Sequence, residues 1–483
     1  MINFRLILTI LGILLVFVGG AMLIPAAADL IAGNTDWQVF LVSAAILLFI
    51  GGGLYLSNRG GGLMLDRRQA FILTTTAWIV MPAAAALPLM FGNLDISFTD
   101  AFFETMSGLT TTGATILSGL DSAPPGILLW RSLLQWFGGI GIIVMAISIL
   151  PLLRVGGMQL FRMEASDASS EKMLPRVGDI VKAIGYIYLT LSLICVLALW
   201  AAGMSLFEAV NHAMSTISTG GFSTSDKSAG FFENPLVESI MVVFMIMGAM
   251  PFLMYLHFVK GKPGSFLMDS QIRWFLSLIL ISIFIMVCWQ IFRNETPFWD
   301  ALRHSTFSVT SVITGTGFAT VDYSTWGGFG MAGFFFLMFI GGCAGSASCS
   351  IKVFRVQIVV ETLRCRLMQM IRPNGIFIPR YNGRPLPDET ITSVASFIFL
   401  FLTIFGLITI GLSLTGLDFV TALSSAGTAI TNVGPGLGEI VGPSGNFQSL
   451  SDPAKWMMSL AMLLGRLELF TVLVLFSRRF WLR

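Results

Sequence analysis

The sequence predicts an all-α polytopic membrane protein. We expect four helix–re-entrant segment–helix repeats with pseudo-fourfold symmetry, plus two extra N-terminal transmembrane helices. Three observations predict this fold: the composition, the long apolar stretches, and a short motif that recurs four times between them. The 483 residues are 55% hydrophobic and 11% charged, whereas soluble domains carry about 25% charged residues. Mean hydropathy is +0.83, so lipid is the expected solvent for most of the chain.

Ten stretches are apolar over about the 20 residues that a transmembrane helix needs. They lie near 6–25, 38–57, 70–92, 128–153, 183–203, 235–259, 274–292, 329–358, 391–415 and 454–477. Ala26, Ala27 and Ala28 after the first stretch mimic the cleavage site of a signal peptide. We favour an uncleaved span, because only then does the number of spans agree with the distribution of charge.

Lys and Arg are divided unequally between the two sides of this topology. Of 28 such residues, 22 lie in the termini and in alternate connections, and one, Arg466, lies inside an apolar run. The other five are Arg131, Lys227, Arg293, Arg303 and Lys455. Because cytoplasmic loops are enriched in Lys and Arg, both termini are expected in the cytoplasm. Ten spans satisfy the even number that this requires.

The spans divide into an N-terminal pair and four repeats. The pair takes residues 1–65, and each repeat is expected to hold a first span, a re-entrant segment and a second span. The four repeats are 66–182, 183–273, 274–390, in which the second helix is expected to be broken, and 391–483.

Four short segments lie between the two spans of each repeat, on the outer side. They cover about 99–116, 207–224, 299–320 and 419–437 and are too short to cross a bilayer. Each runs from an Ala to a Gly, and the pairs are Ala101 and Gly113, Ala209 and Gly221, Ala301 and Gly317, and Ala422 and Gly434. The third spacing is longer by four residues, about one helical turn. Gly220 and Gly315 leave the register of the second and third copies open.

The repeated motif predicts a pore. A short helix that enters from outside ends with partial negative charge, which favours a cation beyond it. The Thr- and Gly-rich chain that follows can point carbonyl oxygens into a lumen, and four such strands can replace the hydration shell of a cation. A single Thr-Gly stretch is more often a plain turn, but four in equivalent places favour a filter. The candidate K+-binding residues are Thr111, Thr112, Gly113, Thr219, Gly220, Gly221, Thr316, Gly317, Phe318, Asn432, Val433 and Gly434.

These motifs resemble those of the TrkH/TrkG/KtrB superfamily of K+ transport subunits, which is related to plant HKT transporters. The resemblance covers essentially the whole chain and includes the extra N-terminal pair. It implies four M1–pore-loop–M2 units in a bacterial cytoplasmic (inner) membrane. In this superfamily Gly in all four filters accompanies K+ selectivity, and Ser in the first accompanies Na+ transport. Gly113 therefore implies K+, with Rb+ as a surrogate and Na+ a poor substrate, whereas carbonyl chemistry alone indicates only a monovalent cation.

The eighth span contains ten consecutive small residues, from Gly341 to Ser350. Gly and Ser are poor helix formers, so we expect an unwound loop below the filter that acts as a gate. The alternative is a close helix–helix contact made by small residues. The resemblance implies a Gly-rich intramembrane loop here, although many members have more glycine after the Ser than this chain. Candidate gate residues are Gly341, Gly342, Gly345, Ser346, Lys352 and Arg466.

Two of these gate residues are cations. Lys352 follows the loop closely and is expected to cap it or to meet a cytoplasmic partner. Arg466 lies in the last apolar run, where an arginine costs several kcal/mol unless it is paired or hydrated. Glu468, two positions on, faces another direction, so Arg466 is expected to repel K+ or hold loop carbonyls. The family has a gating arginine here; the alternative is a structural ion pair with Glu468.

Other residue types argue against an enzyme. The chain has no Walker A motif and no GxGxxG after a strand, and its five cysteines form no CxxC pair. We expect no cofactor apart from K+ ions in the filter, and no nucleic acid. Glu104, Asn211, His212 and His304 are interpreted as hydrogen-bonding groups behind the filter.

Regulation is expected to come from a separate protein. By resemblance the partner is TrkA, a cytoplasmic ring of nucleotide-binding RCK domains, docked on the basic segments 154–182 and 352–390. The family also forms homodimers. The alternative function is a K+ symporter coupled to H+ or Na+, which the scarcity of intramembrane acids beyond Glu104 and Glu468 disfavours.

Overall fold

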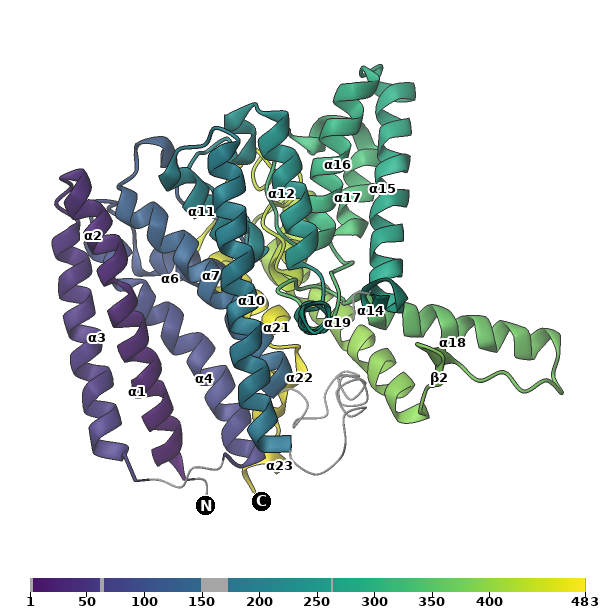
Figure 1. The fold of residues 1–483 in the computed structure, drawn as a ribbon, viewed down its shortest axis with the longest axis horizontal. Coiled ribbons are helices and arrows are strands. Elements are labelled where there is room, and N and C mark those ends of the chain that lie inside the picture. The colour runs from purple at the N-terminus through teal and green to yellow at the C-terminus, as the bar shows by residue number, and fades with distance from the viewer. Residues whose placement is uncertain (1–2, 61–64, 149–172, 262–263, 483) are drawn as a thin grey trace.

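A computed structural model describes residues 3–60, 65–148, 173–261 and 264–482. In these residues the chain is a bundle of helices from which α18 (Val353–Ile371) projects sideways (Figure 1). The start of α1 (Phe4–Ala21) and α23 (Arg478–Trp481) lie at the same end of the bundle (Figure 1). Some features of the sequence fall outside the described residues. They are the end of the predicted span at 128–153, the rest of 149–172, and five of the counted charges: Arg154, Arg162, Lys172, Lys262 and Arg483.

The two N-terminal segments form a closely packed pair. They comprise α1, α2 (Leu23–Ala32) and α3 (Trp37–Asn58). A Cβ atom placed on Gly12 would lie 2.7 Å from the carbonyl oxygen of Gly51, and the reverse distance is also 2.7 Å. The two backbones are therefore in contact, as small residues permit between membrane helices.

The remaining helices follow in four groups. The first group contains α4 (Arg67–Ala85), α5 (Leu87–Phe91), α6 (Phe98–Leu109), η1 (Leu120–Ser122) and α7 (Pro125–Ser148). The second contains α10 (Met173–Ala201), α11 (Leu206–Ile217), η2 (Ser228–Phe232), α12 (Pro235–Gly248), α13 (Phe252–Val259) and α14 (Gly264–Met268). The third contains α15 (Ser270–Asn294), α16 (Phe298–Thr314), η3 (Tyr323–Trp326), α17 (Gly327–Leu337), α18, β1 (Arg380–Tyr381) and β2 (Arg384–Pro385). The fourth contains α19 (Asp388–Leu414), α20 (Phe419–Thr431), α21 (Asp452–Arg466), α22 (Phe470–Leu473), η4 (Val474–Phe476) and α23.

One short helix stands in the middle of each group. These four, α6, α11, α16 and α20, have 12, 12, 17 and 13 residues. Ser97, Ser205 and Asp418 cap three of them with side-chain oxygens that accept backbone N–H groups, as N-caps usually do. The extra residues of the third copy therefore lengthen its helix, as its longer Ala-to-Gly spacing predicts.

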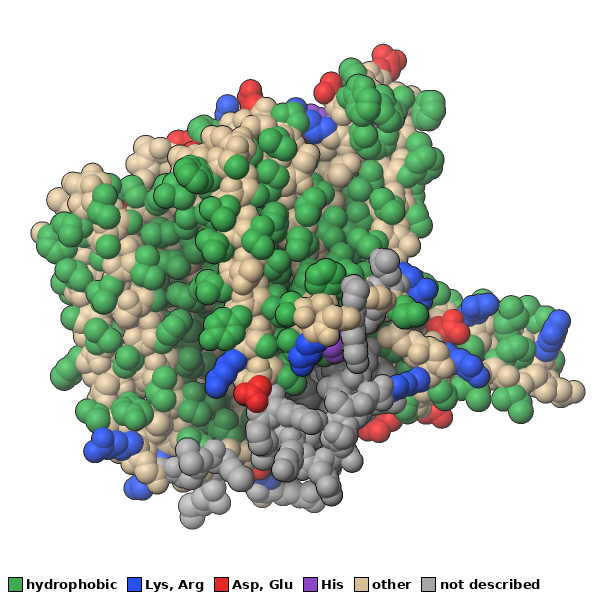
Figure 2. Space-filling view, viewed as in Figure 1, with side chains coloured by type: hydrophobic (Ala, Val, Ile, Leu, Met, Phe, Trp, Pro, Cys, Tyr) green, Lys and Arg blue, Asp and Glu red, His purple; other side chains and the backbone are tan. Residues whose placement is uncertain are grey.

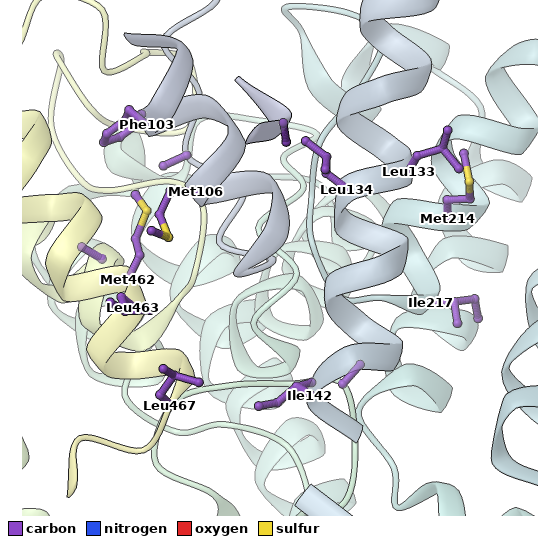
Figure 3. Packing of buried hydrophobic residues seen from close by; sticks show 14 of the residues in the cluster. Phe103, Met106, Leu133, Leu134, Ile142, Met214, Ile217, Met462, Leu463 and Leu467 are labelled. Carbon is purple, nitrogen blue, oxygen red and sulfur yellow. The ribbon is translucent and has the colours of Figure 1, made fainter. Parts of the chain in front are cut away.

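The second helices of the groups pack between successive short helices. α7 contacts α6 and α11, α12 contacts α11 and α16, and α21 contacts α20 and α6. Figure 3 shows this packing: Leu133 of α7 lies beside Met214 of α11, and Met106 of α6 beside Met462 of α21. The short helices of the four groups are thereby arranged around a common centre.

Three of the second helices are interrupted. α12 and α13 meet at 93° around Pro251, whose ring cannot continue a helix, and α21 and α22 meet at 106°. The sequence predicts a break only in the third repeat; the stretches at 235–259 and 454–477 are broken as well. In the second case Glu468 and Leu469 have φ values of 58° and 48°, which no α-helix accommodates.

Seven helices in the described residues are long and apolar enough to cross a membrane, or nine if each bent pair is one span. The eighth expected span, 329–358, is not among these helices: it consists of α17, a non-helical stretch and the start of α18. Hydrophobic side chains cover the visible flank of the bundle (Figure 2), and Phe49, Phe292 and Leu414 are each more than 80% exposed. Such a surface requires lipid around it, so the chain is a multi-pass membrane protein.

The glycine contact of the N-terminal pair yields a prediction. Gly51→Val should separate α1 from α3 and lower the thermal midpoint of the purified protein, because overpacking costs about 1–3 kcal/mol. Gly52→Val is the control, because nothing lies within 4 Å of a Cβ there. The measurement is thermal unfolding in detergent, and equal midpoints for the two variants would contradict the contact.

Candidate functional site

The four short helices end in the same backbone turn. One or two residues after each helix the backbone is left-handed, at Thr111, Thr219, Gly315 and Asn432, with φ of 53°, 52°, 76° and 54°. In every copy, the N–H of the residue after this left-handed residue donates to the carbonyl of the residue five positions earlier. Thr112 donates to Ser107 in the first copy, and Val433 donates to Thr428 in the fourth. This left-handed helix end is a Schellman-type motif. Because the turn is shared, Gly113, Gly221, Gly317 and Gly434 occupy equivalent positions, which resolves the register in favour of Gly221 and Gly317.

Threonine is unusual in this turn. A β-branched residue rarely adopts positive φ, yet Thr111 and Thr219 both do so and are buried. Backbone held in a sparsely populated conformation persists only where its surroundings over-determine it, and it is concentrated at functional sites. The turn is therefore imposed by the packing around the helix ends.

The four equivalent glycines form a closed ring. A Cβ atom placed on Gly113 would lie 2.2 Å from the Gly220 oxygen, and one on Gly221 would lie 2.0 Å from the Thr316 oxygen. The same atom on Gly317 would lie 2.8 Å from the Gly434 nitrogen, and one on Gly434 would lie 3.1 Å from the Gly113 oxygen. Each copy thus touches the backbone of the next. We call these four residues the glycine ring.

Most of the other predicted filter residues lie in or beside this ring. Asn432 joins the fourth copy to the first, because its Nδ2 donates to the hydroxyl of Thr112 at 2.9 Å. Two predicted carbonyls are already bonded from behind: Gln135 Nε2 donates to the Gly220 oxygen at 2.6 Å, and Ser311 Oγ donates to that of Phe318 at 2.6 Å.

A buried ion pair braces the first two copies. Arg131 Nε lies 2.8 Å from Glu104 Oε1, and the two side chains are 2% and 1% exposed. Glu104 also accepts the N–H of Ile116, while Arg131 donates to the carbonyl of Ser223 and lies over the ring of Phe222. The charge count treats Arg131 as one of the cations on the side opposite the termini; the structure places it inside α7, where it is buried.

The histidine on α11 has a related role. The two nitrogens of His212 lie 2.9 Å from the carbonyl of Glu208 and 3.0 Å from the hydroxyl of Ser223, and its ring stacks on Phe318. Glu104 and His212 are hydrogen-bonding groups behind the ring, as the sequence predicts. Asn211 bonds to the carbonyl of Phe207 in its own helix.

A recurring close contact that sequence reasoning missed lies in three of the second helices. A Cβ atom on Gly138, Gly248 or Gly465 would lie 1.9, 2.7 or 2.2 Å from a carbonyl oxygen at the end of a short helix. Those carbonyls belong to Leu109, Ile217 and Ile430, two residues before the left-handed residue in each copy. The sequence contains a signal for this contact: a Gly occurs inside the second apolar span of the first, second and fourth repeats.

The stretch between α17 and α18 is a compact loop, which we call the 338–352 loop. Its two ends pair through Gly341, whose N–H donates to the carbonyl of Ile351 at 2.9 Å. Its middle bonds to the break between α12 and α13: Cys343 N–H donates to the carbonyl of Ala249, and Phe252 N–H donates to that of Gly345. The predicted gate residues Gly341, Gly342, Gly345 and Ser346 all lie here.

The 338–352 loop lies against the inner ends of two short helices. Ser350 Oγ donates to the carbonyl of Thr431, the last residue of α20, at 2.9 Å. A Cβ atom on Gly315, which follows α16, would lie 3.6 Å from Ser348 Oγ. The loop is therefore next to the glycine ring on the side of the helix C-termini.

Arg466 holds this loop to α7. It is 2% exposed, and it donates to the carbonyls of Ala347 at 3.1 Å and Gly138 at 2.8 Å, and to Cys349 Sγ. Glu468 pairs with Arg355 instead, so the alternative of an Arg466–Glu468 pair is not observed. Lys352 Nζ donates to the carbonyl of Ser348.

Only a small space remains beside these groups. A cavity of about 30 Å³ lies between the loop and α21 and is lined by Gly345, Ser346 and Arg466 among others. Within the described part of the chain, the loop and Arg466 therefore lie together around a small space on the inner side of the ring.

The chain matches known transport proteins over its whole length. A family model described as the cation transport protein TrkH matches residues 36–482. The chain belongs to the TrkH family. The Trk system potassium uptake protein TrkI of Halomonas elongata is 44% identical over 98% of this chain and 96% of that protein. TrkH of Escherichia coli K12 is 37% identical over 99% of both chains.

A solved structure confirms the TrkH fold. The crystal structure of the potassium transporter TrkH from Vibrio parahaemolyticus matches with a TM-score of 0.92 and 36% identity, covering 99% of this chain and 100% of that one. The family resemblance seen in the sequence motifs is thereby confirmed. The TrkH family is one of transport proteins and not of enzymes.

The buried ion pair provides a test of what holds the first two copies together. Arg131→Gln should leave Glu104 as an uncompensated buried charge, costing about 3–5 kcal/mol, and the thermal midpoint should fall sharply. The double variant Glu104→Gln/Arg131→Gln should recover part of this loss. Glu361→Gln is the control, because its pair with Arg364 is 3.8 Å long and largely exposed. Equal losses in the single and double variants would contradict a coupled pair.

Proposed function

We propose that the chain mediates K+ uptake through a pore whose selectivity filter is the glycine ring and the residues around it. The closed ring of four backbones is the single observation that carries this proposal. The names of the relatives, Trk system potassium uptake proteins, supply the ion. We extend K+ from those relatives to this chain, and we propose Rb+ as its surrogate and Na+ as a poor substrate.

The chemistry of the ring suits a dehydrated monovalent cation. Four helices end beside it, and the partial negative charge of their C-termini favours a cation there. Carbonyl and hydroxyl oxygens of Thr111, Thr112, Thr219, Thr316 and Asn432 and the backbone of Val433 are the proposed ligands around the four glycines. The carbonyls of Gly220 and Phe318 already accept side-chain hydrogen bonds. We propose that each of these oxygens contacts K+ through its second lone pair.

The proposed gate is the 338–352 loop together with Arg466 and Lys352. A guanidinium that donates to the loop carbonyl of Ala347 and to α7 fixes the loop across the inner side of the ring. Its positive charge opposes the passage of K+. Opening then requires the loop to leave Arg466, and Gly341, Gly342, Gly345 and Ser346 supply the necessary backbone freedom.

We propose a bacterial inner-membrane location with both termini in the cytoplasm, following the distribution of Lys and Arg. The basic segment from Lys352 to residue 390 is the proposed docking surface for a TrkA-like ring of RCK nucleotide-binding domains. A homodimer is also proposed. Its support is a stripe of exposed apolar residues on the projecting helix α18, which are Val359, Val360, Leu363, Leu367 and Met370.

The alternative, a K+ symporter coupled to H+ or Na+, predicts a closed-off site near the middle of the membrane with carboxylates facing it. Glu104 pairs with Arg131, and Glu468 pairs with Arg355. Both acids are therefore held by arginines, which favours a channel.

The test is voltage-driven Rb+ uptake into proteoliposomes that hold this chain alone. Uptake should need no Na+ or proton gradient, and Gly113→Ser should raise Na+ permeability relative to Rb+, because Gly113 has φ of 84° and no room for a Cβ atom. Gly119→Ser is the control: it also has positive φ, 74°, but its nearest neighbour is 3.8 Å away. Uptake that requires a proton or Na+ gradient would establish the symporter, and an unchanged ion ratio in Gly113→Ser would exclude the ring as the filter.

Arg466 provides a test of the gate. Arg466→Ala should raise Rb+ flux several-fold, because the loop loses its bonds to α21 and a repelling charge is removed. Arg466→Lys should lie between the two, since an ammonium keeps the charge but not the planar fork of donors. Monodisperse protein with flux unchanged from the parent chain would contradict the gate.

A further inference from the structure

A polar pocket lies at the edge of the bundle, apart from the glycine ring and the proposed gate. It has a volume of about 510 Å³ and lies between the start of α15, α18 and the hairpin β1–β2. Its lining residues are Met268, Asp269, Ser270, Arg273, Trp274, Gln357, Arg380, Asn382 and Gly383. A pocket of this volume accommodates a phosphate-bearing headgroup with room to spare.

The positive charges of the pocket are available to a ligand. Arg273 and Arg380 are exposed, and neither forms an ion pair within the part of the chain that the structure describes. The negative charge of Asp269 is engaged, because its carboxylate caps α15 by accepting the N–H groups of Gln271 and Ile272 at 2.8 and 3.3 Å. Arg273 feels the attraction of the nearby Asp269 carboxylate, but neither guanidinium forms a close ion pair among the described residues. Both can therefore contact a phosphate, which guanidinium groups bind well.

The residues around the pocket favour a lipid, rather than a soluble anion, as the ligand. Arg273 begins a stripe at helical spacing that continues through Ser277, Leu280 and Phe284 along the outside of α15. Leu280 and Phe284 are 66% and 68% exposed, so they face the acyl chains of the bilayer. Trp274 lies half-buried at the pocket, where the indole group favours the membrane interface. A phosphate held at Arg273 would thus have its chains lying along this stripe.

We infer that the pocket is a binding site for an anionic phospholipid, with the headgroup phosphate held by Arg273 and Arg380 and the acyl chains lying along α15. On the orientation proposed above, the site faces the cytoplasmic leaflet, whose anionic lipids attract basic groups near the membrane surface. Asn382, whose Oδ1 accepts the N–H of Ser270 at 3.1 Å, fixes the hairpin that carries Arg380 to the start of α15.

The site is also connected to the 338–352 loop. Gln271, next to the pocket residue Ser270, accepts the N–H of Ala344 at 3.0 Å. Gln357 of α18 lines the pocket five residues after Lys352, where the loop ends. A lipid bound here joins α18, which begins where the loop ends, to α15, whose Gln271 bonds to the loop, and it adds a restraint on their relative position.

The test compares lipid binding by the full chain and two double variants in detergent, using native mass spectrometry. Arg273→Gln/Arg380→Gln should weaken phosphatidylglycerol binding about 10- to 30-fold, because each cation near the surface contributes about 1 kcal/mol. Arg59→Gln/Arg479→Gln is the matched control, because it removes two exposed arginines that lie outside the pocket. Phosphatidylcholine should bind all three proteins equally.

A second readout separates loss of the site from misfolding. Phosphatidylglycerol should raise the thermal midpoint of the parent chain and of the control, whereas the pocket variant should keep its midpoint in phosphatidylcholine and lose only the increase. Equal phosphatidylglycerol affinity in the pocket variant and the control would overturn the site. Inorganic phosphate that displaces the lipid at millimolar concentration would make a soluble anion the ligand and would overturn the lipid assignment.

Discussion

The structure depends on four backbone turns packed so closely side by side that a Cβ atom on each ring glycine would lie within 3.1 Å of the next copy. Each end turns through a left-handed residue, and each following glycine lies against the next copy. Side chains of neighbouring helices must then fix the turned backbone from behind. Gln135 and the Glu104–Arg131 pair do this for the first two copies, and Gly138, Gly248 and Gly465 let the second helices approach the ends closely.

The interrupted helices follow from a second constraint, that backbone groups in a membrane must be satisfied within the protein. The break between α12 and α13 exposes carbonyls of Gly248 and Ala249, and the 338–352 loop exposes N–H groups of its own. The two irregular segments bond to each other, with Ala347 N–H donating to Gly248 and Cys343 N–H donating to Ala249. An interruption in one group is thus stabilised by an interruption in the next.

The local sequence pattern predicts part of this architecture, but it does not predict the features that depend on contacts between distant residues. Composition and Ala-to-Gly spacing predict the membrane fold and the longer α16, since both depend on residues near one another in sequence. The burial of Arg131 was missed, because its partner Glu104 belongs to another helix and the count of charges treats every Arg alike. The break after Arg466 was also missed: Glu468 and Leu469 adopt positive φ there without a Gly or Pro to signal it.

Arg466 brings these constraints together in the proposed gate. Its partners among the described residues are neutral: two carbonyls and a thiol, while its Nε has none. A charge so placed is stabilised mainly by dipoles, and the negative ends of the short helices near the ring supply the largest ones. K+ in the proposed filter would be stabilised by the same helix dipoles. In the proposed mechanism the cation and the guanidinium would therefore repel each other, and a K+ ion in the ring would ease release of the loop carbonyl of Ala347.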